Sequence, residues 1–177
     1  QSGMFAFITG SSGVFQGIFG LSSIGFGLMF AAIATALIIF GRINGMLLNR
    51  YSPEQILTAV LPLFFAATLV LALLSQTSSL LVFAIPLWIS IGCVGLLSAN
   101  AMSIAMSLTE KGAGMGSALL GAIQFALAFA VSTSVAIGGA GTALPMSLGL
   151  VVPAGLATVL FFAAGRFTVP SSPRLTF

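Results

Sequence analysis

The chain has 177 residues, of which 59% are hydrophobic and only 4% are charged, with a mean hydropathy of +1.23. A soluble globular domain carries about 25% charged residues, so this composition excludes a soluble fold and indicates a protein embedded in lipid. The net charge of +3 comes from five cations spread along the chain, which excludes the clustered basic patch of a nucleic-acid-binding protein.

Apolar segments follow one another along the whole chain, separated by polar or glycine-rich breaks. A membrane-spanning helix needs about 20 predominantly apolar residues. Six segments are predicted to span: residues 1–19, 24–48, 54–74, 80–108, 114–137 and 145–164. The first is the weakest, because it is barely long enough and contains several polar residues. The sequence therefore predicts an all-α membrane protein, with a six-helix transmembrane domain over residues 1–164 and a polar tail over residues 165–177.

The charged residues give this division an orientation. With six spans, all seven charges fall in or next to connections on one side of the membrane: Arg42, Arg50, Glu54, Glu110, Lys111, Arg166 and Arg174. Lys and Arg are enriched in cytoplasmic loops. We therefore expect the charged side, including the C-terminal tail, to be cytoplasmic.

Two side-chain amides lie inside the apolar segments on either side of the loop at residues 109–113. Gln124 is about 10 residues into its predicted helix, which puts it roughly 15 Å deep, near the membrane midplane. A buried amide in a membrane faces another helix or a wet cavity. Gln124 is therefore interpreted either as a substrate-cavity residue or as an interhelical hydrogen-bonding residue. Asn100, which begins a polar stripe with Ser103 and Ser107, either lines a cytoplasm-facing vestibule or holds helices together.

Two further residues are candidates for a substrate cavity. Gln16 lies near the outer end of the first segment, and Trp88 could stack on aromatic compounds or simply contact lipid. The spacing Gly41-x-x-x-Gly45 predicts close helix packing.

Groups that support catalysis are missing from the apolar segments. The chain contains no His and no Asp, and both of its Glu residues are predicted at the cytoplasmic boundary. Intramembrane hydrolysis needs an activated nucleophile, a base or a metal site. We therefore expect no enzyme activity, no metal site and no cofactor.

The predicted second-to-third loop carries a motif. It reads Gly45-Met46-Leu47-Leu48-Asn49-Arg50-Tyr51-Ser52-Pro53-Glu54 and resembles the Gly-x-Leu-x-Asp-Arg-x-Gly-Arg-Arg loop of the major facilitator superfamily. Gly45, Leu47 and Arg50 match, whereas Asn49 replaces the acid. Weakened forms of this loop are usual in the C-terminal half of that superfamily. The resemblance makes Gly45, Asn49 and Arg50 candidates for a cytoplasmic gating loop.

Three other stretches resemble the bicyclomycin/chloramphenicol-resistance (Bcr/CflA) branch of drug:proton antiporters. Residues 113–125 resemble the start of the eleventh helix of that branch, and residues 4–16 resemble its seventh helix. Ala99-Asn100-Ala101 falls where the tenth helix usually has Pro-Asn-Ala. The resemblance covers essentially the whole chain, in the right order and spacing.

This resemblance implies that the chain is the C-terminal six-helix half of a twelve-helix major facilitator fold, clipped within its seventh helix. The implied function is efflux of drugs or other small amphipathic compounds across the bacterial inner membrane by alternating access. The implied partners are the small-molecule substrate, the lipid bilayer, the N-terminal six-helix half, and protons that couple through that half, because a proton relay needs a buried titratable group. The alternative is a non-transporting six-helix scaffold or channel subunit.

Overall fold

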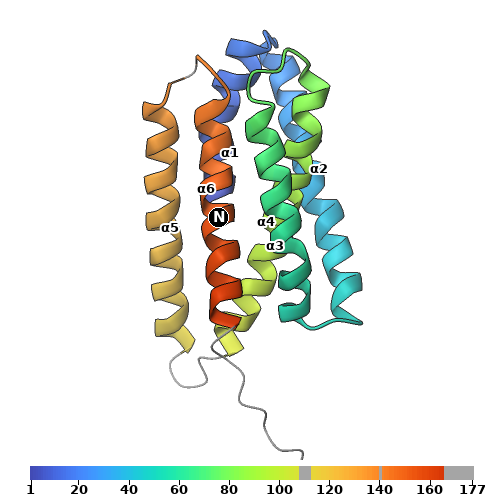
Figure 1. The fold of residues 1–177 in the computed structure, drawn as a ribbon, viewed down its shortest axis with the longest axis vertical. Coiled ribbons are helices and arrows are strands. Elements are labelled where there is room, and N and C mark those ends of the chain that lie inside the picture. Colours follow the sequence, from blue (N-terminus) through green and yellow to red (C-terminus); the bar gives the residue numbers. More distant parts are fainter. Residues whose placement is uncertain (108–112, 140, 166–177) are drawn as a thin grey trace, which may run out of the picture.

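The computed structural model describes residues 1–107, 113–139 and 141–165, and these residues are helical with short connections (Figure 1). The elements are α1 (Ser2–Ser12), the π-helix η1 (Gly13–Ile18), α2 (Ser23–Leu48), α3 (Pro53–Leu73), α4 (Leu80–Ser107), α5 (Ala113–Ile137) and α6 (Leu144–Gly165). The all-helical prediction is confirmed for the described part of the chain. Five of the described helices, α2 to α6, are long and apolar enough to cross a membrane. Helix α1 is shorter and continues directly into η1.

Polar residues define where two of the long helices begin. The Ser22 hydroxyl accepts a hydrogen bond from the Gly25 amide at the start of α2. Helix α3 begins with a capping box, in which Ser52 and Gln55 each accept a hydrogen bond from the other's backbone amide. Pro53 occupies the first turn of α3, where no backbone N–H is needed.

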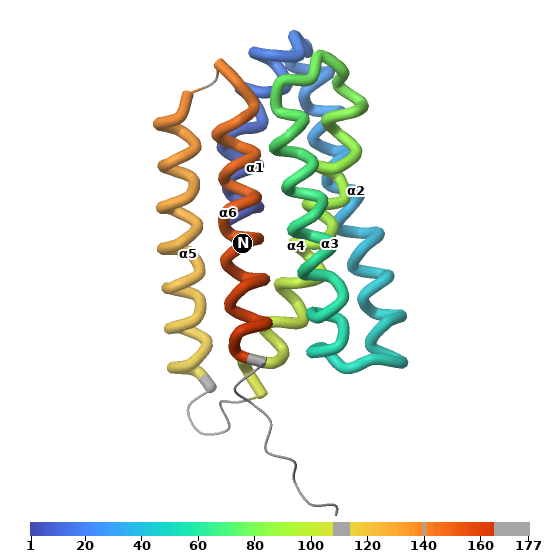
Figure 2. The backbone as a smooth tube through the Cα atoms, viewed as in Figure 1, coloured from blue at the N-terminus to red at the C-terminus, as the bar shows by residue number. Residues whose placement is uncertain are grey.

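The helices lie side by side along one long axis, and the tube in Figure 2 shows α5 at one edge of the bundle and α2 toward the other. Helix α4 packs on α2 and α3, while α1 packs on α5 and α6, and α3 also contacts α6. The α2–α3 turn, the end of α4 and the start of α5 lie at the same end of the bundle (Figure 1). The described charged residues, Arg42, Arg50 and Glu54, are next to this turn.

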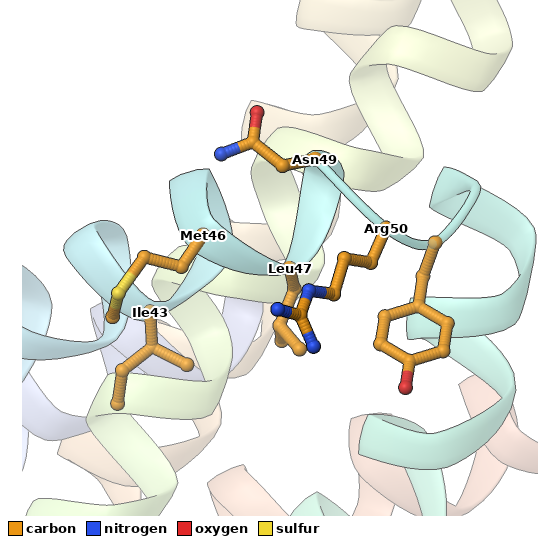
Figure 3. A pocket seen from close by; sticks show the side chains of 6 residues that line it. Ile43, Met46, Leu47, Asn49 and Arg50 are labelled. Carbon is orange, nitrogen blue, oxygen red and sulfur yellow. The ribbon is translucent and has the colours of Figure 1, made fainter.

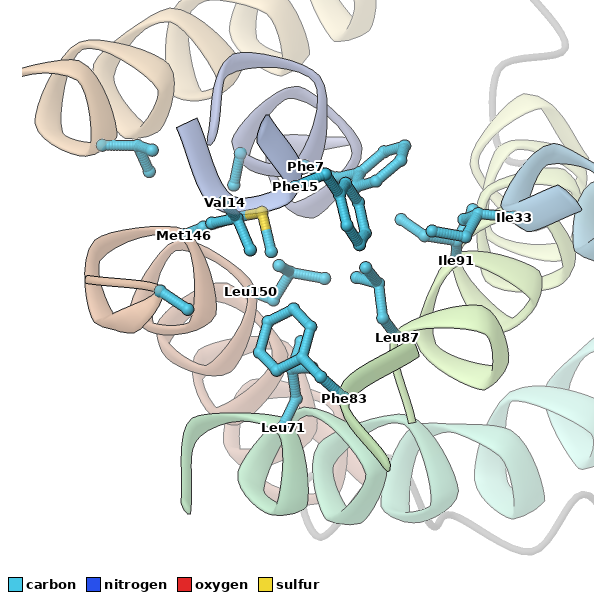
Figure 4. Packing of buried hydrophobic residues seen from close by; sticks show 13 residues of the cluster. Phe7, Val14, Phe15, Ile33, Leu71, Phe83, Leu87, Ile91, Met146 and Leu150 are labelled. Atoms are coloured by element: carbon cyan, nitrogen blue, oxygen red, sulfur yellow. The ribbon is translucent and has the colours of Figure 1, made fainter. Parts of the chain in front are cut away.

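The hydrophobic core is formed where several helices meet. Figure 4 shows Phe7 and Phe15 next to Leu87 and Ile91, with Leu150 among them. All five side chains are at most 2% exposed. These five side chains come from α1, η1, α4 and α6, and they join elements that are far apart in the sequence.

Helices α2 and α5 are the least covered of the five long helices. In the most apolar window of each, only 11% of residues are buried, against 56% in α4. Large apolar side chains on both helices are exposed, including Leu28 (69%) on α2 and Phe129 (72%) on α5. The bundle therefore presents two broad apolar helix faces that its own described helices do not cover.

The close glycine contacts between α2 and α4 do not involve Gly41 or Gly45. A Cβ built on either glycine meets nothing within 4 Å, so the described residues supply no partner for the predicted packing. The close contacts are made instead by glycines of α4. A Cβ on Gly92 would lie 2.5 Å from the Phe40 ring, and one on Gly95 would lie 2.9 Å from Leu37. The spacing on α2 was a valid packing pattern, but it lies on an exposed face of the helix.

Candidate functional site

Gln124 lies at the middle of α5 and is half-buried. It shares a helical face with Ala128 and Ser132, and this face borders α1. Nearby, Thr9 of α1 and Ser132 form an interhelical hydrogen bond. Among the described residues, none forms a hydrogen bond with the Gln124 amide. The amide is therefore not an interhelical hydrogen-bonding group within this part of the chain, and both its donor and acceptor atoms are free for another partner.

Asn100 lies in the contact between α2 and α4. Its side chain is 1% exposed, and its Nδ2 donates to Asn44 Oδ1 at 2.6 Å and to the Leu96 carbonyl at 2.8 Å. Both partners are acceptors, so the amide nitrogen must face them. Asn100 Oδ1, which points elsewhere, is buried and accepts no hydrogen bond from the described residues. Of the two interpretations of Asn100, the structure shows the one that joins helices.

The polar stripe predicted from Asn100 does not form one continuous buried surface. Ser103 and Ser107 are exposed, and the Ser107 hydroxyl donates to the carbonyl of Ile104 in its own helix. Asn44, which is 7% exposed, was missed by the sequence reasoning. The signal was available, because Asn44 is a side-chain amide inside a long apolar helix, as Asn100 and Gln124 are.

Trp88 lies on the same α2–α4 contact, closer to the middle of the two helices. Its Nε1–H donates to Thr35 Oγ1 at 3.2 Å, and its ring meets the Phe40 ring edge-on, with centroids 5.6 Å apart. The side chain is half-buried. Trp88 is therefore held against α2. Its hydrogen-bond acceptor, Thr35, is the second polar residue of the α2–α4 contact, after Asn44, that was not predicted from the sequence.

Gln16 lies in the π-helix η1. It is half-buried, and its Nε2 donates to the Ser12 hydroxyl one turn earlier at 3.1 Å. Single π-helical turns are rare and are often found at functional sites. A small cavity of about 150 Å³ lies next to η1, lined by residues of α1, η1, α5 and α6 and of the α5–α6 connection. Gln16 itself does not line this cavity.

The predicted gating-loop residues lie at the end of α2. Asn49 and Arg50 line an open groove of about 620 Å³ with Ile43, Met46, Leu47 and Tyr51. Figure 3 shows the Arg50 side chain turning back beside Leu47, while Asn49 points to the other side. The backbone amides of Arg50 and Tyr51 both donate to the Leu47 carbonyl, which closes the turn. Gly45 is exposed one turn before it.

The candidate residues do not form a single cluster. Trp88 and Asn100 share the α2–α4 contact, whereas Gln124 is on α5, Gln16 is in η1, and Asn49 and Arg50 are at the end of α2. No group of three His, Cys, Asp or Glu that could hold a metal is present in the described ranges. Apart from Arg50, these residues offer neutral hydrogen-bonding groups and an aromatic ring, a chemistry that suits binding of uncharged or amphipathic molecules.

Comparisons with known proteins give related sequences. The chain is 30% identical over 92% of its length to a protein named as the uncharacterized MFS-type transporter YdgK of Bacillus subtilis. It is 28% identical over 81% of its length to a bicyclomycin resistance protein homolog of Haemophilus influenzae, and 27% identical over 70% to a chloramphenicol resistance protein of Pseudomonas aeruginosa. Neither a protein-family model nor a solved structure matches the chain significantly.

The matched region covers only part of each relative. It corresponds to 40%, 36% and 29% of their respective lengths, so the chain spans about two-fifths or less of the proteins that it matches. Together with its long apolar helices, this similarity places the chain in the major facilitator superfamily, beside relatives named for drug resistance.

Proposed function

We propose that this chain is the C-terminal six-helix half of a twelve-helix transporter that exports drugs or other small amphipathic compounds by alternating access. The similarity to an MFS-type transporter and to two drug-resistance proteins supports transport as the activity. The share of those relatives that the chain spans supports its being one half of the protein. In this proposal, α1 and η1 together form the first of the six spans.

The observation that carries the proposal is the environment of Gln124. A half-buried amide at the middle of a membrane helix is expensive unless it has a partner, and the described residues do not supply one. Transporters of this kind bind substrate near the midplane, at the interface between repeats. Gln124 is therefore assigned to the substrate cavity between the two halves, together with Gln16 and Trp88. Asn100, which is 1% exposed and bonded to Asn44, is assigned to the α2–α4 contact instead.

The exposed faces of α2 and α5 are assigned to the lipid bilayer and the N-terminal half. Both helices are at the edge of the bundle and expose large apolar side chains. A second six-helix half packed there would enclose a cavity between the halves. The loop residues Gly45, Asn49 and Arg50 would then lie at the end where the halves separate and close.

The orientation follows from the charges. The described charged residues, Arg42, Arg50 and Glu54, are next to the α2–α3 turn, and basic residues favour the cytoplasmic side. We assign this end, and with it the C-terminus, to the cytoplasm, and the protein to the bacterial inner membrane. Because the described spans contain no acid near their middle, proton coupling is assigned to a carboxylate of the N-terminal half.

The alternative, a six-helix scaffold or channel subunit, makes a different prediction. The decisive experiment compares drug accumulation in cells that express the full-length protein, residues 1–177 alone, or an empty vector. We expect lower accumulation only with the full-length protein, and loss of the difference when an uncoupler dissipates the proton gradient. Proton-dependent export by residues 1–177 alone would contradict the assignment to one half, and equal accumulation in all three strains would contradict export.

A further inference from the structure

The indole of Trp88 is held at two points by α2. Its N–H donates to Thr35 Oγ1 at 3.2 Å, and the Phe40 ring meets it edge-on with an interplanar angle of 76°. Because Trp88 is half-buried, part of the ring remains accessible while these two contacts restrict its rotation.

Thr35 accepts this hydrogen bond in a defined geometry. Its own hydroxyl donates to the carbonyl of Ala32, one turn earlier, at 2.6 Å. Because the hydroxyl proton is directed to that carbonyl, the oxygen lone pairs face away from the helix, where they can accept from the indole N–H. The two hydrogen bonds in series also polarise one another.

The place of Thr35 in the fold is consistent with a role in a binding cavity. Thr35 is at the middle of α2, and its side chain is exposed although Trp88 of α4 contacts it. An exposed hydroxyl that accepts from a neighbouring helix adds little to the packing of the core. Its clearest physical effect is to determine the orientation of the Trp88 ring.

An oriented ring favours one class of ligand. Aromatic rings prefer offset-stacked or edge-to-face contacts, and a group that is already ordered loses less entropy on binding. We propose that Thr35 is a positioning residue that holds the Trp88 indole for stacking against planar aromatic substrates. This inference rests on the proposed transport function and specifies its substrate class.

The test compares Thr35→Val with Thr35→Ser in the full-length transporter. Valine has nearly the same shape as threonine but cannot accept a hydrogen bond, whereas serine keeps the hydroxyl. Initial rates of export give the KM and the maximal rate for each compound of a panel of planar aromatic and aliphatic compounds. The panel includes chloramphenicol, which has an aromatic ring, and bicyclomycin, which has none. Thr158→Val is the matched control, because the Thr158 hydroxyl donates to the Ala154 carbonyl of its own helix and has no side-chain partner among the described residues.

We expect Thr35→Val to raise KM for the aromatic compounds by roughly 2- to 12-fold, the effect of losing one neutral hydrogen bond. The maximal rate, and the KM for aliphatic compounds, should change less than about twofold. Thr35→Ser should restore the KM, and Thr158→Val should leave it unchanged. In a Trp88→Phe background, which lacks the indole N–H, Thr35→Val should have no further effect.

The outcomes separate this inference from the function on which it rests. A protein that exports no compound of the panel contradicts the proposed function and the inference with it. A protein that exports the panel, but in which Thr35→Val acts equally on aromatic and aliphatic compounds, contradicts the inference alone. The same conclusion follows if the effect of Thr35→Val persists in the Trp88→Phe background, or if only aliphatic compounds are exported.

Discussion

Replacing one amide of the Asn44–Asn100 pair should destabilise the protein by about the energy of one hydrogen bond. Asn44→Leu removes the acceptor at 2.6 Å and leaves the Asn100 amide with the Leu96 carbonyl. Asn100→Leu leaves Asn44 Oδ1 without this donor at a site that is 7% exposed. A neutral hydrogen bond contributes about 0.5–1.5 kcal/mol, and interhelical side-chain bonds in membranes fall in a similar range.

The double variant Asn44→Leu/Asn100→Leu should behave differently from either single one. Replacing both partners by apolar groups of similar shape is often nearly neutral or even stabilising. The two substitutions are therefore expected to be strongly non-additive.

The measurement is thermal unfolding of the purified protein in detergent. A dye that reacts with thiols reports unfolding through Cys93, which is fully buried in α4 and is the only cysteine of the chain. At about 2–4 °C per kcal/mol for a chain of this size, each single variant should lower the melting temperature by about 1–6 °C. The double variant should melt within about 2 °C of the unmodified protein. A double variant that loses as much as the two single variants together would refute the pairing.

Three further predictions concern packing, the cavity and orientation. Gly92→Ala should lower the melting temperature, because the new Cβ would lie 2.5 Å from the Phe40 ring of α2 and overpacking costs about 1–3 kcal/mol. Gly41→Ala should be neutral or slightly stabilising, because a Cβ there meets nothing within 4 Å. Gln124→Ala in the full-length protein should weaken export of polar compounds by roughly 2- to 12-fold at an unchanged melting temperature. An equal loss of export for every compound, with a lower melting temperature, would show instead that the amide holds helices together. In a background without Cys93, a cysteine at Thr77 should react with an impermeant thiol reagent in intact cells and one at Asn49 should not, and the reverse result would invert the orientation.

Much of the helical architecture could be predicted because it depends on composition and local signals. Runs of apolar residues separate clearly from polar breaks, and the Ser-Pro at residues 52–53 indicates a helix start by itself. Helix α3 does begin at Pro53. The family could also be inferred, since the loop after α2 and the start of α5 carry recognisable motifs.

Contacts between helices could not be predicted in the same way. A side-chain amide such as Asn100 signals that a partner exists, but its partner Asn44 is 56 residues away, and only the relative rotation of α2 and α4 brings the two together. The same limitation applies to Gly41 and Gly45, which have no close neighbour among the described residues. Their spacing allows close packing, but periodicity cannot tell which face of α2 meets another helix. The glycines that meet α2 closely, Gly92 and Gly95, are on α4.

The contact between α2 and α4 has a consequence for how the chain is made. Phe26 and Phe30, in the first part of α2, contact rings of η1 and α1, which are synthesised earlier. In the second part, Phe40 and Asn44 contact α4, which is synthesised later. About 59 residues separate the end of α2 from the end of α4, which a ribosome takes roughly 3–12 s to translate at 5–20 residues per second. During this interval the Asn44 amide lies in the nascent membrane protein before its partner exists, so a chaperone or the insertion machinery has several seconds in which to contact this part of α2.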